Sequence, residues 1–559
     1  MLIKHIRRRA TLALVLALLA GASRAGAQGT ATLPSSDLVY RDIDRLSELG
    51  FLDSVIIGQR PYSRREIGRI LRAARERSNR LGERGVSHLI TDLELSIGDG
   101  LLRRLETRFS REVDDDPSQD AFISPLDRIA IVVSSTDAMR RGFPATHTAP
   151  IEATIGSLIP RRLGPQIRPG TTGAFELAQR VEPTGWLAFT ARERVEFYKP
   201  RDTTQTERSG ELLLGVARAR LANVALSIGR EQIAWAQTED AGLLFAADAP
   251  AVDQISLSSD HPFVLPSFLR HLGPTQATLV VADLGASRVR SHSKLLAYKV
   301  SVQPTGGSEI GASFMNHFGG KGGAPSSAVD RVIDFLPFID IFRRHNYYDT
   351  TRTLDVDSDK ILGLDGRLRL GGLRGVLFTG EMIIDDFDVH RLPKLLTGYG
   401  SQTFGITLPR FVSPLVSLKL SATHMGVIAY SHPALSNGIT TRGRLLGNEL
   451  GPDAKAFGGQ LTWEPTPSVR VGLEGRRAIY SDAEYATSYE GANNTRFVVR
   501  KVSKQPDEFR DRIGSSLLVQ TEAGPAVTFR VVGERARNYQ FQGGDRRYYA
   551  AELALQLQQ

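Results

Sequence analysis

The chain contains no cysteine among its 559 residues. Disulfide bonds and thiolate metal sites are therefore excluded. Beyond its first residues the sequence also lacks any run of about 18 apolar residues, the length that a membrane-spanning helix needs. A membrane protein built on helices is excluded as well.

The chain also has only a small excess of charge of one sign. The formal net charge is +9, but residues 1–27 carry five cations and no acid, which leaves +4 for the rest of the chain. Dedicated nucleic-acid binders concentrate basic residues on one face or helix. We therefore expect no nucleic-acid partner.

Common catalytic and ligand-binding motifs are missing too. The stretch Asp355–Asp359 starts like a calcium loop, but Lys360 and Gly366 stand where such a loop needs glycine and glutamate. No Ser or Thr follows Gly319–Lys321, as a phosphate loop requires, and no Gly-x-Ser-x-Gly elbow occurs. We predict no cofactor, no metal site and no catalytic residue, with a loosely bound surface cation as the alternative to the metal-free interpretation.

The N-terminus has the order of an export signal. Basic residues come first, an apolar core of about ten residues follows, and Ala25-Gly26-Ala27 fits a cleavage site. We predict a signal peptide over residues 1–27. A buried N-terminal helix is the alternative.

A helical period follows from about residue 36 to 112. Leu38–Leu49 repeats leucine and isoleucine at helical spacing, and Gly50 is a natural stop. Ser63-Arg64-Arg65-Glu66 fits a capping box at the start of a second helix. We predict a periplasmic helical subdomain, a bundle or plug, over residues 28–118.

From about residue 119 onward the period changes from 3.6 to 2. In residues 416–424, Val, Leu, Leu and Ala alternate with Ser, Lys, Ser and Thr. The same alternation occurs in residues 187–197, 362–370 and 469–476 and continues to the C-terminus. Such alternation indicates a sheet with one apolar and one polar face.

A membrane barrel explains this alternation better than a soluble sandwich. The polar faces carry arginine and carboxylates in strand after strand, and the segments have the roughly ten residues of a tilted spanning strand. We therefore predict a mainly β fold, a transmembrane antiparallel barrel of about 16 to 18 strands over residues 119–559. A soluble β-protein is the alternative.

Several segments resemble the capsule assembly Wzi family of outer-membrane proteins. They are Leu38–Leu71, Gly229–Pro250, Phe314–Gly323, Gly380–Asp388 and, as the closest match, Tyr430–Ala454. Their order and spacing carry the resemblance. The chain departs from the family at Trp235–Thr238, where a Trp-Gly-Pro-Gly turn is usual, and at its Leu-Gln-Gln end, where a terminal aromatic is usual.

The resemblance implies a barrel of about 18 strands with a helical bundle at the periplasmic side. It also implies an outer-membrane lectin that binds capsular polysaccharide and helps to organise the capsule, without enzymatic activity. We accordingly expect an outer-membrane location, with surface polysaccharide and membrane lipid as partners. The sequence leaves the oligomeric state open, and a monomer is our expectation.

Residues 430–454 have the chemistry of a glycan site. Sugars need aromatic rings for their C–H faces and fixed polar groups for their hydroxyls, and arginine binds acidic sugars through two hydrogen bonds. The candidates for ligand binding are Tyr430, His432, Asn437, Thr441, Arg442, Arg444, Trp235, Arg230, Glu381 and Asp385. The alternative is an ordinary polar hairpin whose arginines pair with carboxylates in the barrel lumen.

Two of these candidate groups have further interpretations. Trp235 is either a stacking platform for sugar or a girdle residue at the membrane interface. The acidic cluster of residues 381–388 could perform glycosidase chemistry or pair with lumen arginines. At the level of the whole protein, a porin-type channel and a glycan-cleaving enzyme are the alternatives to a lectin.

Overall fold

A computed structural model describes most of the chain. The described residues are 31–53, 55–83, 91–114, 121–139, 141–142, 154–155, 157–159, 163, 167–238, 242–323, 358–385, 400–431, 435, 437–481, 483–490, 496–504, 506–522 and 524–558. The predicted signal peptide, His432, Asp386 and Asp388 lie outside the described residues.

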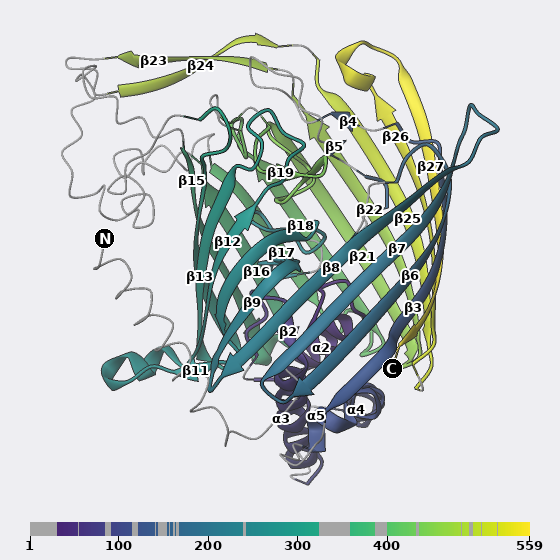
Figure 1. Cartoon of the computed structure of the whole chain (residues 1–559), viewed down its shortest axis with the longest axis vertical. Coiled ribbons are helices and arrows are strands. Elements are labelled where there is room, and N and C mark those ends of the chain that lie inside the picture. The colour runs from purple at the N-terminus through teal and green to yellow at the C-terminus, as the bar shows by residue number, and fades with distance from the viewer. Residues whose placement is uncertain are drawn as a thin grey trace, which may run out of the picture.

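Most of the described strands form one closed antiparallel barrel with 18 strand positions (Figure 1). The first half of its strands is β3 (Phe122–Thr136), β6 (Gly170–Thr184), β7 (Leu187–Pro200), β8 (Glu207–Leu221), β9 (Val224–Glu231), β10 (Val252–Ser259) with its short neighbour β11 (Phe263–Val264), β12 (Pro274–Asp283), β13 (Lys294–Thr305) and β14 (Ser308–Phe318). The second half is β15 (Ser358–Leu370), β16 (Val376–Ile384), β17 (Gly400–Leu408), β18 (Val416–Met425), β21 (Ala454–Thr466), β22 (Val469–Tyr480), β25 (Glu508–Gln520), β26 (Ala526–Arg537) and β27 (Asp545–Gln558). The barrel closes where β27 pairs with β3, Leu555 opposite Ile131.

The two-residue period determines which side chains face outward. In β7, Val195 and Phe197 are 45% and 44% exposed, whereas Arg192 and Arg194 are 7% and 3% exposed. The apolar side chains therefore cover the outer wall and the charged ones line the interior, as the sequence predicts for a barrel in lipid. The predicted fold class is confirmed.

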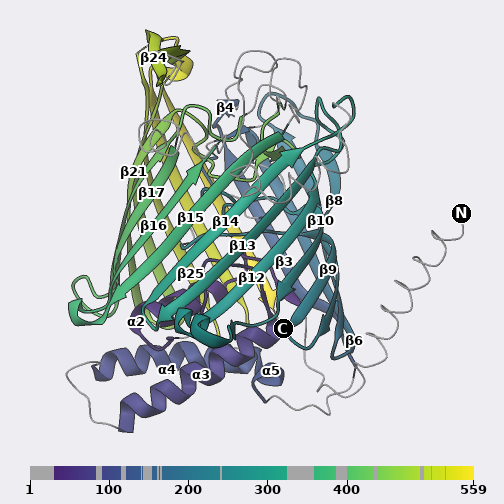
Figure 2. The same cartoon turned by 90° about the vertical axis from the view of Figure 1, so that its left-hand side faces the viewer.

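Helices gather at one end of the barrel, called here the helical end (Figure 2). They are α2 (Val39–Leu49), α3 (Arg64–Glu83), α4 (Asp92–Arg108) and α5 (Ser110–Asp114), with the two-stranded pair β1 (Thr32–Leu33) and β2 (Tyr62–Ser63). Helix α2 ends as predicted at Gly50, which has a positive φ of 91°. No helix in the described ranges is long and apolar enough to cross a membrane.

The predicted capping box at Ser63 forms in one half. The Ser63 hydroxyl accepts a hydrogen bond from the Glu66 amide at 3.1 Å, but the Glu66 carboxylate accepts from Arg69 at 2.7 Å. A complete capping box occurs at Thr91 and Glu94, at the start of α4.

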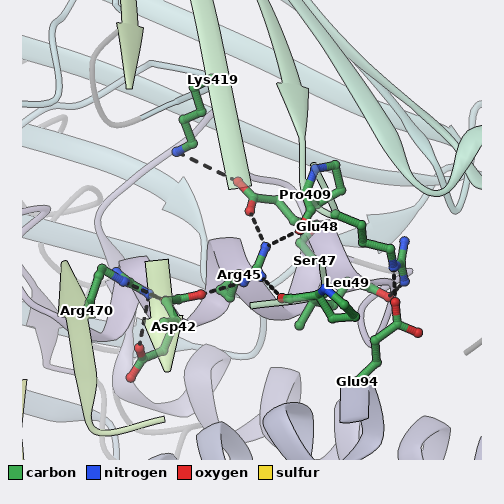
Figure 3. A network of polar contacts seen from close by, with 12 residues as sticks. Asp42, Arg45, Ser47, Glu48, Leu49, Glu94, Pro409, Lys419 and Arg470 are labelled. Carbon is green, nitrogen blue, oxygen red and sulfur yellow. Dashed lines mark hydrogen bonds and ion pairs between the residues drawn. The ribbon is translucent and has the colours of Figure 1, made fainter. Parts of the chain in front are cut away.

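Helix α2 lies against the barrel, and arginine side chains hold it there (Figure 3). Arg45 of α2 pairs with Glu464 of β21 at 2.7 Å and donates to the Pro409 carbonyl at 3.0 Å. In the opposite direction, Arg410 of the barrel donates to the Leu49 carbonyl at 3.1 Å and pairs with Glu94 of α4. Guanidinium groups at the C-terminus of a helix satisfy its free carbonyls and oppose its dipole.

Long connections occupy the opposite end of the barrel, called here the loop end (Figure 1). Two of them combine into a four-stranded sheet in the order β19-β20-β5-β4. Its strands are β4 (Arg141–Gly142), β5 (Thr154–Ile155), β19 (Thr440–Thr441) and β20 (Arg444–Leu445). A separate hairpin, β23 (Ala483–Glu490) and β24 (Arg496–Lys504), extends one further connection.

We predict that Arg410→Met detaches the helices from the barrel. The change leaves the buried Glu94 without this cation, and breaking a buried ion pair costs about 3–5 kcal/mol. Limited proteolysis in detergent should cleave the helical region at least ~100-fold faster, since each 1.4 kcal/mol is a factor of about ten. Arg75→Met is the matched control, because its pairs with Glu106 and Asp99 are partly exposed and such pairs contribute about 1 kcal/mol or less each. Equal cleavage of both variants contradicts the prediction.

A second prediction concerns pH. Burial alone would raise the pKa of Asp37, but the Arg108 guanidinium, which donates to it at 2.6 and 2.7 Å, lowers the pKa from 3.8 to about 2. Ionised Asp37 therefore stabilises the helical region by about 2 kcal/mol above pH 4, and this contribution is lost as the pH falls from about 4 to about 2. Hydrogen exchange of α2 should show this loss in the wild type, whereas Asp37→Asn should start lower and lack the step. A step of equal size in Asp37→Asn excludes Asp37 as its cause.

Candidate functional site

Two connections fold into the barrel interior and form its core at the loop end. The described part of the first inner loop, residues 232–238 and 242–251, lies between β9 and β10. The described part of the second inner loop, residues 426–431, 435 and 437–453, lies between β18 and β21. Both contribute to one buried apolar cluster with inward-facing wall residues such as Met315 and Ile383. The candidate residues belong largely to these two loops or to the wall that they contact.

The side chain of Glu381 binds the backbone of the first inner loop. This β16 side chain is 6% exposed and accepts hydrogen bonds from the Gln237 and Leu243 amides, each at 2.9 Å. The carboxylate therefore satisfies two donors that the loop could not satisfy itself. The sequence offered an ion pair with a lumen arginine as one role for Glu381, whereas these contacts are with backbone amides.

Asp385 holds the second inner loop in the same way. Its Oδ2 accepts a hydrogen bond from the Tyr430 amide at 2.6 Å, and its side chain is buried. Glu309 of β14 does so for the N-terminal segment, since it accepts from the Ile57 and Gly58 amides at 2.7 and 2.9 Å. Three wall carboxylates thus anchor three inserted segments through backbone N–H groups.

Tyr430 lies at the centre of the core and not on a surface. It is 0% exposed, its hydroxyl donates to the Leu243 carbonyl, and that hydroxyl accepts from the Asn448 amide at 3.0 Å. Burial raises the pKa of this hydroxyl well above its ordinary value. The side chain joins the two inner loops, so we do not retain it as a sugar contact.

Trp235 is also part of the core. It is 4% exposed and packs edge-on against Phe245, with the ring centroids 4.9 Å apart. Neither of its expected positions, a sugar platform or a membrane girdle, agrees with this burial. An indole enclosed in the lumen contacts neither lipid nor external sugar.

The polar residues after Tyr430 bind the neighbouring connection between β12 and β13. The Asn437 side-chain oxygen accepts from the Val289 amide at 2.7 Å, and the Thr441 hydroxyl donates to the Leu284 carbonyl at 3.2 Å. Arg444 is 7% exposed, and it donates to the Asp248 carbonyl of the first inner loop at 2.8 Å. Burial lowers the pKa of Arg444. These groups support the fold of the loop end.

Arg442 differs from the other candidates because it is exposed. It lies in the turn between β19 and β20 with a positive φ of 50° and pairs with Glu211 of β8. The side chains of the two residues are 32% and 30% exposed. Arg442 is therefore a cation that an external ligand can reach.

Arg230 is separated from the rest. It is spaced by two and four residues from Ile228 and Leu226, which are 50% and 40% exposed, so it shares their outward face of β9. There it pairs with Asp253 at 2.7 Å. Of the ten candidates, the structure brings seven together in or around the inner loops, while Arg442 lies at their surface, Arg230 lies on the outer wall and His432 lies outside the described residues.

A polar cavity of about 410 Å³ remains between the inner loops and α2. Its lining includes Glu48 of α2, Asn448 of the second inner loop and Glu381 of the wall. Hydroxyl side chains are frequent around it, among them Thr403, Thr407, Ser417, Thr462 and Ser516. A space of this size and polarity can hold ordered water or a small polar ligand.

The sequence of this barrel matches the model of a known protein family. The model of the capsule assembly protein Wzi matches residues 163–515. The chain belongs to this Wzi family. As a closed barrel with an apolar outer wall in a family of outer-membrane proteins, it is an outer-membrane protein itself.

Solved structures are similar to this chain to different degrees. Wzi of Escherichia coli, an outer-membrane protein involved in group 1 capsule assembly and described as a carbohydrate-binding β-barrel, is 15% identical with a TM-score of 0.61. The match covers 96% of this chain and 100% of that one. OccD3 of Pseudomonas aeruginosa is 11% identical over 78% of this chain and 90% of that one, with a TM-score of 0.41. No curated protein matches the chain.

We predict that Glu381→Ala releases the first inner loop. The change leaves two buried amides without their acceptor, at a cost of about 1–3 kcal/mol each. Planar-bilayer recordings should show higher and noisier conductance than the wild type. Glu193→Ala, which removes an exposed carboxylate from β7, is the control and should leave conductance unchanged. Identical traces for all three proteins would show that Glu381 does not hold the loop closed.

Proposed function

We propose that this Wzi-family protein binds surface polysaccharide non-covalently at the loop end of the barrel and so supports capsule assembly and attachment. Family membership supports the process, and the carbohydrate binding described for E. coli Wzi supports the ligand class. The observation that carries the proposal is the filled lumen. Inner loops enter from one end and α2 from the other, and both are held by charged wall residues.

The loop end is assigned to the cell surface. Bacterial barrels have short turns on the periplasmic side and longer connections outside. Here β8 and β9 are joined by Ala222 and Asn223 alone at the helical end, whereas the long connections lie at the opposite end. We infer that the helical region is periplasmic and that the inner loops are reached from outside.

Arg442 is the residue that we assign to glycan contact. Its guanidinium, which donates to Glu211 through Nη1, can bind a sugar carboxylate through two parallel hydrogen bonds. Because an exposed ion pair contributes little free energy, an acidic polymer can compete with Glu211 for the cation. The buried candidates support the loop that presents Arg442.

We predict that Arg442→Ala weakens binding to surface polysaccharide isolated from the source cells. Loss of one charged hydrogen-bonding partner, worth about 1.5–3 kcal/mol, should raise the Kd about 10-fold or more. The measurement is titration of detergent-purified protein on immobilised polysaccharide. Arg75→Ala is the matched control, because its pair with Glu106 is similarly exposed (30% and 24%) but belongs to the helical end. Equal losses in both variants, or no binding by the wild type, contradict the proposal.

The same preparation separates the two other functions. A porin-type channel should conduct steadily in a planar bilayer, whereas the filled lumen predicts low conductance. A glycan-cleaving enzyme should produce new reducing ends from the polysaccharide. We propose no catalytic step, because Glu381 and Asp385 are both occupied by backbone amides.

A further inference from the structure

A group of arginine side chains lies on the outer wall of the barrel near its loop end. It occupies the upper parts of β22, β25, β26 and β27, at the upper right in Figure 1. The group, called here the outer cationic cluster, consists of Arg477, Arg535, Arg537 and Arg547 together with Asp511 and Asp545. Four cations and two acids give it a net charge of +2.

The strand register places these side chains on one face. Arg477 is opposite Asp511, Asp511 is opposite Arg535, and Arg535 is opposite Arg547, so one row crosses four strands. The face is the outer one, because Ile513 and Tyr549, two residues farther along their strands, are 69% and 60% exposed. Directly opposite residues share a face of the sheet.

The cluster begins where the apolar surface ends. In β26 the outward residues below Arg535 are Val527, Phe529, Val531 and Gly533. Eight positions separate Val527 from Arg535, which is roughly 26 Å along a strand at about 3.3 Å per residue. At a tilt of about 40° this is roughly 20 Å of height, close to the apolar band of about 25 Å. The cluster therefore lies at the level of the lipid headgroups.

The rim on β9 to β13 offers a direct comparison. Arg230, Asp253, Asp283 and Lys294 also form one row across neighbouring strands, and their charges cancel. The positive excess at β22–β27 is therefore not repeated on the β9–β13 part of the rim.

We propose that the outer cationic cluster binds the phosphate groups of a phosphorylated glycolipid in the outer leaflet. Guanidinium groups bind phosphate through paired hydrogen bonds, and a phosphate at this level keeps its acyl chains against the apolar wall below. The ion pairs within the cluster are exposed, with Arg477 at 55% and Arg535 at 53%, so a phosphate can displace their carboxylates at little cost. The proposal rests on the surface assignment of the loop end but not on glycan binding by Arg442.

The test measures lipid retention by native mass spectrometry. Protein in phosphatidylcholine nanodiscs is offered bis-phosphorylated lipid A or the same lipid with both phosphates removed. The wild type should retain the phosphorylated lipid at least ~10-fold better than the dephosphorylated one. A variant with Arg477, Arg535, Arg537 and Arg547 all changed to Gln should lose this preference, whereas Arg230→Gln with Lys294→Gln on the balanced rim should keep it within ~2-fold.

Two further arms keep the outcome decisive. Asp511→Asn with Asp545→Asn removes only the acids and should increase retention at least ~2-fold, which tests the cluster even where the arginine variant fails to fold. Inorganic phosphate at 10-fold excess over the lipid should displace little of it. Equal retention of both lipids by the wild type, unchanged retention in the arginine variant, no gain in the acid variant, or full displacement by inorganic phosphate would each overturn the proposal. Loss of polysaccharide binding with lipid retention intact would contradict the proposed function alone.

Discussion

Hydrogen bonds from backbone amides to wall carboxylates are the interaction on which the interior of this barrel depends. Segments that enter a lumen without forming strands bring N–H groups that must find acceptors. Glu309, Glu381 and Asp385 supply those acceptors to the N-terminal segment and to the two inner loops. A carboxylate is well suited to this role because it accepts several charge-assisted bonds at once. An amide left unpaired there would cost about 1–3 kcal/mol.

The helical end uses the reverse arrangement. There the helix presents carbonyl groups, and Arg369 and Arg410 of the barrel donate to the carbonyls of Glu48 and Leu49. The inner wall therefore needs both signs of charge, acids where amides arrive and arginines where carbonyls arrive. This division explains why the polar faces of the strands carry arginine and carboxylates together. It also explains how a barrel with so large a lumen can be filled from both ends.

The barrel itself could be predicted from the sequence, because its cause is local. In β7, apolar residues such as Val195 and Phe197 alternate with Arg192 and Arg194. This alternation within one strand is enough to predict which side faces lipid. The end of α2 at Gly50 is local as well. The roles of Tyr430, Trp235 and Glu381 were not predictable in this way. Tyr430 contacts Leu243 from 187 positions away, and the inner loops have no period that would reveal this contact.

The sequence therefore predicts where the candidate residues gather better than it predicts what their side chains do. The sequence predicts that aromatic and polar residues contact sugar, but most of them contact other parts of the chain. Arg442 remains accessible because the β19–β20 turn directs it away from the core. Glu309 and Glu211 are functional residues that the sequence does not identify. The alternation of polar and apolar residues can place Glu309 on the inner face of its strand, but it cannot predict which groups Glu309 binds. Composition indicates a polar lumen, while the choice between ligand contact and structural support depends on folded geometry.

Amide hydrogen exchange of the detergent-solubilised protein tests the central claim most directly. The five amides that bind wall carboxylates belong to Ile57, Gly58, Gln237, Leu243 and Tyr430. We expect these five amides to exchange as slowly as the amides of the barrel strands, although none of them belongs to a strand or helix. Exchange as fast as in exposed turns such as Ala222–Asn223 would contradict it.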